Sequence, residues 1–197
     1  MPAHAFVGAN LEKLLSTNAC VSCDLSGADL SNKDLYGSAL DGANLSNANL
    51  SNTLLNDAKF KGANLTGANL SGAISMGTDW SNANLTGAKL AGADLYNALL
   101  SNTKLLNADL SDADLTEAII SDADLSNAIG KNAKLRSAIF SRAILSGADF
   151  SNSYMRNTKL SQATLKGTQL SGADLFNALM PDGTTYNGDV SKFGALQ

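Results

Sequence analysis

Large hydrophobic residues recur with a period of five residues, without insertion, from Leu25 to Met180, and only two positions of the series lack one. This frame contains 32 consecutive pentapeptides, and Leu occupies 23 of the 32 central positions. The residue two before the centre is Ala in 23 repeats, and the residue two after it is Gly in 12 repeats and Asn in 12 others. Each repeat therefore has one small, one large hydrophobic and one turn-forming position, and the remaining positions are mostly polar.

Neither regular secondary structure has this period. Five residues rotate an α-helix by about 500°, so successive centres would spiral around it instead of sharing one face. In a β-strand, a period of five places successive centres on opposite faces. Each pentapeptide must therefore contain a corner, and the Gly and Asn positions supply it, because these residues tolerate the positive φ of a type II turn. We expect a square-cornered coil with hydrophobic side chains and Ala inside.

The pattern Ala-(Asp/Asn)-Leu-Ser-(Gly/Asn), as in residues 28–32 and 43–47, resembles that of the pentapeptide repeat proteins. The resemblance implies an all-β fold, a right-handed quadrilateral β-helix in which four repeats form one coil of 20 residues. Residues 25–182 would then form a solenoid of about eight coils, roughly 40 Å long at about 4.8 Å per coil. Solenoids of this kind need a cap at each end.

Residues 1–24 precede the frame and are expected to form the N-terminal cap. A short helix is predicted to begin at Asn10, which would serve as its N-cap. Leu11, Leu14 and Leu15 would then share one face and cover the open first coil.

Residues 183–197 are expected to form a C-terminal cap or tail. The turn residues that follow Met180 end the repeat. Tyr186, Val190 and Phe193 then supply hydrophobic side chains that would cover the last coil.

Two repeats lack a large hydrophobic centre, because Ser75 and Gly130 occupy it. The residues just before them, Ile74 and Ile129, are hydrophobic. We expect the backbone to be distorted at both sites so that the Ile side chain turns inward.

Cys20 and Cys23 form the only motif that suggests chemistry. A zinc site would need two more ligands, and His4 is the only histidine in the chain. A thioredoxin-like redox motif would need a βαβ context, which the sequence lacks. A structural disulfide or a pair of packing thiols remains, because Cys23 occupies the small position of the first repeat and Cys20 lies just before it.

The segment at residues 20–28 also resembles the start of the repeats in cyanobacterial members of the family. Some of these are exported to the thylakoid lumen or the periplasm, so the resemblance favours such a location over the alternative, the cytoplasm. In an exported protein, Cys20 and Cys23 would be oxidised to one another.

The net charge of −4, with only 16% charged residues, excludes a generic basic nucleic-acid-binding protein. Six carboxylates without an intervening Lys or Arg are Asp109, Asp112, Asp114, Glu117, Asp122 and Asp124. Some pentapeptide repeat proteins resemble duplex DNA in shape and charge and bind type II topoisomerases, which gives an alternative function. These acids span most of one coil, however, and the coils that follow are basic. We therefore expect the six carboxylates to form a ring around the rod and not a stripe along it, and the surface charge to change sign along the rod.

Positions just before each centre should face solvent, and most are Asp, Asn or Lys. Leu99, Ile119 and Ile139 are exceptions and lie 20 residues apart, so they should stack in one outward column. They are either ordinary sheet surface, which suits β-branched residues, or a patch that contacts a partner. A second outward column combines aromatic residues, a methionine and arginines: Tyr36, Met76, Tyr96, Arg136, Arg156 and Phe176.

These observations predict a non-catalytic structural or protein-binding scaffold. The filled interior leaves no cleft for catalytic residues. Within the repeats, Gly recurs at corners, with Gly130 as the exception, so no phosphate-binding loop is present. We expect no cofactor, no direct binding of nucleic acid and no membrane insertion, since no hydrophobic run approaches the roughly 20 residues that span a bilayer. The expected partner is another protein or a second copy of the chain.

Overall fold

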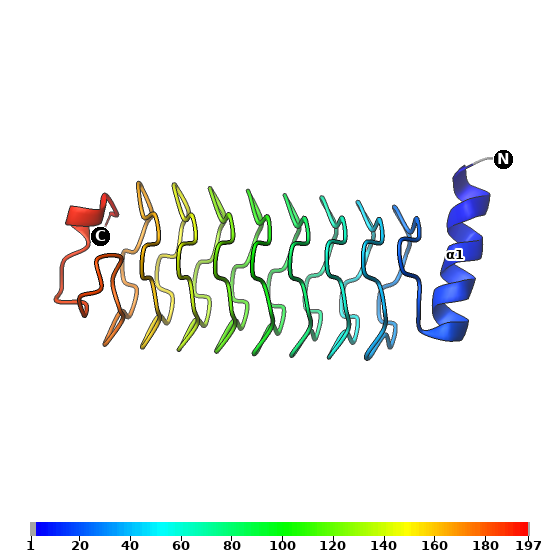
Figure 1. The fold of residues 1–197 in the computed structure, drawn as a ribbon, viewed down its shortest axis with the longest axis horizontal. Helices are drawn as coiled ribbons and strands as arrows, with labels where there is room; N and C mark the ends of the chain where they lie inside the picture. Colours follow the sequence, from blue (N-terminus) through cyan, green and yellow to red (C-terminus); the bar gives the residue numbers. More distant parts are fainter. Residues whose placement is uncertain (1–2, 197) are drawn as a thin grey trace.

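The chain forms a rod of stacked coils that is closed by a different structure at each end (Figure 1). The computed structural model describes residues 3–196, with side chains from residue 8 onward. Helix α1 (Ala3–Thr17) lies across the first coil, and the 3-10 helix η1 (Ser191–Phe193) belongs to the segment at the far end. The side chain of His4 lies outside the described residues.

The coils are joined by parallel β-bridges between residues 20 apart, from Ala19–Ala39 to Lys159–Leu179. One coil therefore contains four pentapeptides, as the resemblance implies. The N–H of each central residue from Leu25 to Leu160 donates forward to the next coil, as in Leu25 N to Asn44 O at 2.7 Å. The N–H of Asn44 donates backward to Cys23 O at 2.8 Å. Neighbouring coils are thus held by backbone hydrogen bonds on all four faces.

Each corner has the backbone conformation that the Gly and Asn positions predict. The residue two after every centre has a positive φ, between 55° and 71°, from Ser22 to Asn177. A hydrogen bond closes the turn at every centre except Ser75, as from Ala28 N to Leu25 O at 3.0 Å. Three long side chains, Glu117, Arg142 and Gln162, occupy this left-handed conformation as well. The corner geometry is therefore imposed by the coil and is only made easier by Gly and Asn.

The prediction that a distorted backbone at Ser75 and Gly130 turns Ile74 and Ile129 inward is wrong. The bridges continue regularly through both sites, and Ile74 and Ile129 face outward with 37% and 43% of their surface exposed. The hydrogen-bonded ladder therefore fixes the direction of each side chain even where the core lacks a hydrophobic group.

Neighbouring aromatic side chains fill the space that Ser75 and Gly130 leave. The indole of Trp80, the next centre along the chain, donates to Ser75 Oγ at 3.2 Å, and Ser75 Oγ contacts Thr78 Oγ1 at 2.9 Å. At Gly130, an added Cβ would collide with the ring of Phe150, the centre stacked on it one coil later. The core is complete because a larger residue accompanies each missing side chain.

Helix α1 begins earlier than predicted, at Ala3, so Asn10 lies inside the helix and is not its N-cap. Its side chain instead donates to the backbone oxygen of Asp24 at 2.9 Å and ties the helix to the first coil. Leu14 is fully buried and Leu11 packs against the core. Leu15 is 49% exposed, so the prediction that it covers the coil is wrong.

The C-terminal segment packs on the last coil through the residues that the sequence predicts. Val190 is 1% exposed, and Tyr186 and Phe193 are partly buried against the core. Two bridges attach the segment to the coil, a parallel one from Gln169 to Leu196 and an antiparallel one from Leu179 to Thr185.

Candidate interaction surfaces

The interior offers no room for a reaction, because Leu, Ala and aromatic side chains fill it and are almost all buried. Among the described residues, no group of three or more His, Cys, Asp or Glu side chains is arranged to hold a metal ion. Within the same part of the chain, no helix has the length and hydrophobicity needed to cross a membrane. Any function must therefore be carried by the outer surface and the two ends.

Cys20 and Cys23 form a disulfide at the junction between α1 and the first coil. Cys20 is fully buried and Cys23 is 8% exposed. The bond lies beside Lys13, whose ammonium group is 3.9 Å from Cys23 Sγ. This burial supports a structural role for the pair and leaves neither sulfur open to a substrate.

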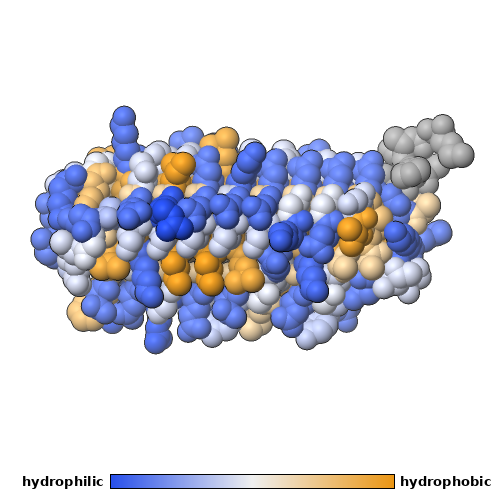
Figure 2. Space-filling model, in the orientation of Figure 1, coloured by the Kyte–Doolittle hydropathy of each residue, from blue (hydrophilic) through white to orange (hydrophobic). Residues whose placement is uncertain are grey.

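Leu99, Ile119 and Ile139 are stacked in one outward column by consecutive parallel bridges. We call these three residues the ridge. Leu99 is 37% exposed, and the two isoleucines are half-buried by their neighbours. Asp79 and Lys159 continue the column at either end, so charged residues bound the ridge. Figure 2 shows that hydrophobic side chains on the visible face of the rod gather in short rows among hydrophilic ones.

A shallow hollow of about 300 Å³ lies on the adjacent face, between Tyr36 and Tyr96, with Met76 in its lining. Each tyrosine hydroxyl donates to a carboxylate one coil further on, Tyr36 to Asp57 and Tyr96 to Glu117, both at 2.9 Å. These hydrogen bonds, together with the negative charge of the acceptors, raise the pKa of both phenols. Two members of the second outward column, Tyr36 and Tyr96, are thus held by hydrogen bonds to acidic side chains.

Three of the six acids in the ring contact side chains of the next coil. Lys134 Nζ lies 3.3 Å from Asp114 Oδ2, and Arg142 Nη2 lies 2.6 Å from Asp122 Oδ2. The hydrogen bond from Arg142, aided by its charge, lowers the pKa of Asp122. Asp112 accepts a hydrogen bond from the side chain of Asn132 at 3.1 Å. The two ion pairs neutralise part of the ring, and none of these contacts extends the acidity along the rod.

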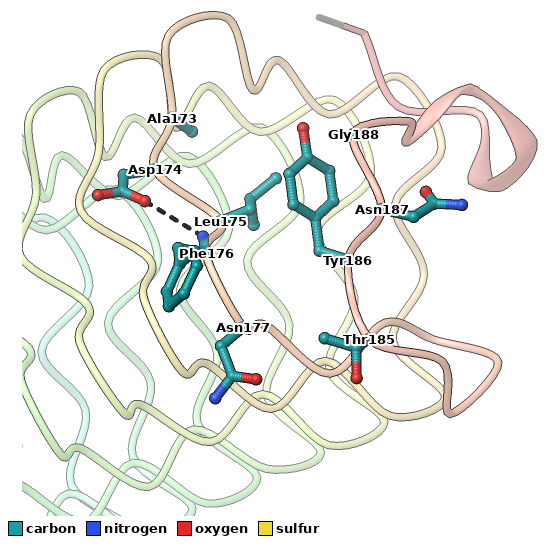
Figure 3. A pocket seen from close by; sticks show the side chains of 9 residues that line it. All are labelled: Ala173, Asp174, Leu175, Phe176, Asn177, Thr185, Tyr186, Asn187 and Gly188. Atoms are coloured by element: carbon teal, nitrogen blue, oxygen red, sulfur yellow. Dashed lines mark hydrogen bonds between the residues drawn. The ribbon is translucent and has the colours of Figure 1, made fainter.

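A larger hollow of about 550 Å³ lies at the C-terminal end, between residues 173–177 of the last coil and residues 185–188 (Figure 3). Leu175 and Tyr186 approach one another across it, and Phe176 lies at its side with 66% of its surface exposed. Sequence reasoning missed this site, because it arises where the chain leaves the frame and crosses the end of the rod. The only feature of the sequence that pointed to this hollow was the end of the repeat after Met180.

These features define a solenoid whose outer surface and ends are the parts open to a partner. The family model for pentapeptide repeats matches eight copies within residues 20–57, 38–74, 77–102, 93–129, 108–147 and 143–180. The chain therefore belongs to the pentapeptide repeat family, whose fold is a right-handed quadrilateral β-helix and whose members are generally non-catalytic structural or binding proteins.

Several solved structures of the family are similar to this chain. HetL from the cyanobacterium Nostoc sp. strain PCC 7120, a protein involved in heterocyst differentiation regulation, is 29% identical over 91% of this chain and 98% of its own, with a TM-score of 0.46. A pentapeptide repeat protein from the Arabidopsis thaliana thylakoid lumen is 34% identical over 53% and 70%, with a TM-score of 0.48. QnrB1, a plasmid-mediated fluoroquinolone resistance protein, is 22% identical over 81% and 82%, with a TM-score of 0.42. The search of curated proteins found no match.

Proposed function

We propose that this chain is a non-catalytic scaffold that binds another protein, or a second copy of itself, through the ridge. The observation that carries the proposal is the stacking of Leu99, Ile119 and Ile139 in one outward column by consecutive bridges. A continuous hydrophobic strip on a rigid surface is a feature of protein contact sites. The bridges hold the strip in place before a partner arrives, which lowers the entropic cost of binding.

The test is the triple variant Leu99→Asn, Ile119→Asn and Ile139→Asn. Asn already occupies outward bridge positions such as Asn64 and Asn84, so the coil should form as before. We expect an unchanged circular dichroism spectrum, together with weaker self-association in sedimentation velocity or weaker capture of partner protein.

The matched control replaces Ile129 and Ile144 by Asn. Both are outward and exposed, at 43% and 42%, but they lie on other faces and do not stack on one another. This control should behave like the unmodified chain. If the ridge variant and the control sediment and capture alike, the ridge is ordinary sheet surface and the proposal fails.

The charges argue against the alternative, a DNA mimic directed at a type II topoisomerase. A mimic needs acidity that is sustained along the rod, whereas Asp114 and Asp122 are paired with bases of the next coil. In a supercoiling assay we therefore expect no change in topoisomerase activity when the chain is added. An effect at stoichiometric concentration would restore the alternative.

A further inference from the structure

The last coil ends in a β-edge on one face, and the coil before it shows what that edge lacks. On this face, Met155 N donates to Asp174 O and Asp174 N donates to Ser153 O, both at 2.9 Å. Asn157 N donates to Phe176 O at 3.0 Å. A complete coil thus offers two forward-pointing N–H groups, at the centre and two residues after it, and one carbonyl two residues before the centre.

The C-terminal segment provides at least one backbone partner on each of the other three faces of the last coil, although among the described residues the N–H groups of Leu165 and Gly172 still lack one. At five positions the segment makes the backbone hydrogen bonds that a further coil would make. These hydrogen bonds run from Gly167 N to Gly194 O, from Leu170 N to Leu196 O, from Leu196 N to Thr168 O, from Met180 N to Thr184 O and from Tyr186 N to Ala178 O.

The fourth face receives no such partner. Among the described residues, no backbone group pairs with the N–H of Leu175, the N–H of Asn177 or the carbonyl of Ala173. These three groups belong to residues that line the 550 Å³ hollow (Figure 3). The intervening Phe176 N–H is satisfied within the coil by the carboxylate of Asp174 at 3.1 Å. The groups left open are thus the ones that an added strand would use.

We propose that this hollow binds an extended peptide segment of another protein, which pairs in parallel with residues 173–177 and adds one rung to the ladder. A residue placed over Asp174 would donate its N–H to Ala173 O and accept from Leu175 N–H. The residue two further on would accept from Asn177 N–H. Backbone pairing of this kind supplies affinity, and alternate side chains supply specificity.

The shape of the site indicates the side chains that such a segment would carry. The residue between the two pairing positions would stack inward on Leu175, beside Tyr186, which favours a large hydrophobic group. The flanking residues would face Asp174 and the ring of Phe176. Arg156 of the coil before already pairs with the Asp174 carboxylate and lies 5.2 Å from the centre of the Phe176 ring. A basic residue still suits both positions, because one would share the carboxylate with Arg156 and the other would lie over the exposed part of the aromatic ring. The hollow has the size of a small-ligand pocket, about 300–1,000 Å³, and holds only a short segment.

The probe for this site is an acetylated and amidated peptide that copies residues 132–138, Asn-Ala-Lys-Leu-Arg-Ser-Ala. It carries the required hydrophobic residue between two basic ones. When the peptide is titrated into the full chain, we expect the amide resonances of Leu175 and Asn177 to shift. Their hydrogen exchange should slow as well.

Two N-methylated peptides separate backbone pairing from other contacts. Methylation at the lysine removes the N–H that would donate to Ala173 O, and we expect binding to weaken about tenfold or more. Methylation at the leucine is the matched control, because that N–H would point away from the coil, and we expect less than about a threefold change.

The proposal concerns a surface other than the ridge, so either can fail alone. It is overturned if millimolar peptide shifts no amide of residues 173–177, or if both methylated peptides bind alike. It is also overturned if the Leu175 and Asn177 amides become protected as the concentration of the chain alone rises, because the occupant would then be a second copy.

Discussion

At the scale of the residue, the corner decides which amino acids the repeat accepts. The position two after each centre from Leu25 to Leu175 has a left-handed backbone, a conformation that costs most residues about 1–2 kcal/mol. Gly meets no such cost, and Asn meets a reduced one because its short polar side chain bonds locally. The preference for these two residues is therefore a property of the corner backbone and not of contacts with a partner.

The same substitution should have opposite effects at a corner and in the cap helix. Gly87 has a φ of +65° and Gly8 lies in α1, and a methyl group added at either would meet no atom within 4 Å. We expect Gly87→Ala to destabilise the chain by about 1 kcal/mol and lower the midpoint of thermal unfolding. Gly8→Ala should leave the midpoint unchanged or raise it, since Ala favours a helix. Equal midpoints for the two variants would contradict the corner argument.

At the scale of the element, the sequence predicts the coil because one periodicity decides it. The central hydrophobic position, the small position and the corner all follow from a period of five. The response to Ser75 and Gly130 could not be predicted, because it depends on which stacked neighbour reaches the gap. That neighbour is Trp80, five residues later, in one case and Phe150, twenty residues later, in the other. Side-chain packing between coils sets this choice.

The ends and surfaces were predictable to different degrees. Hydrophobic residues outside the frame correctly indicate that both ends are covered. The start of α1 was not predictable, since Asn10 is a good N-cap but also a good hydrogen-bond donor to the first coil. Outward columns follow from the 20-residue spacing, whereas the hollow at residues 173–177 depends on the path of an irregular segment. Such paths have no periodic signal.

The packing at Gly130 yields a prediction for a coupled pair. Gly130→Leu alone should destabilise the chain by about 1–3 kcal/mol, because the new side chain would enter space held by the Phe150 ring. Phe150→Leu alone should also destabilise it, because it leaves a cavity beside Gly130. The double variant restores two stacked leucines, the arrangement found at Leu90 and Leu110.

A double-mutant cycle in chemical denaturant measures this coupling. We expect the double variant to lose clearly less stability than the sum of the two single variants. Additive losses would show that the Phe150 ring does not compensate for Gly130, and the account of the core given above would then be wrong.

At the scale of the whole molecule, polar side chains form a second set of bonds between coils outside the backbone ladder. In the N-terminal half these are amide contacts, as from Asn64 Nδ2 to Asn44 Oδ1 at 3.1 Å. In the C-terminal half they include ion pairs, as between Lys131 and Asp149 at 3.1 Å. The exposed ion pairs contribute little individually. Their carboxylates nevertheless make the stability of that half depend on pH.

Acid should therefore destabilise the rod in a defined pH range. Burial raises the pKa of Asp149, but hydrogen bonds from Ser151 and Lys131 outweigh it, so the pKa lies below the ordinary value of 3.8. The pKa of Asp114 is lowered against burial in the same way, by Thr116 and Lys134. A carboxyl group whose pKa is lower in the folded chain than in the unfolded chain stabilises the fold at pH values above its pKa in the unfolded chain. This stabilisation is lost as the pH falls through the pKa of the folded chain. We expect thermal unfolding midpoints that are level between about pH 5 and 7 and decline below about pH 4.

The double variant Asp114→Asn and Asp149→Asn tests the origin of this decline. Asn preserves the turn at such positions, since Asn44 Oδ1 accepts from Ser46 N at 3.2 Å just as Asp149 Oδ1 accepts from Ser151 N at 3.0 Å. The substitutions remove the titrating charges together with their ion pairs to Lys134 and Lys131. The variant should therefore lose less stability than the unmodified chain between pH 5 and pH 3, as measured by calorimetry. An identical decline in both proteins would mean that other carboxylates govern the acid response and that the charge pairs between coils do not couple stability to pH.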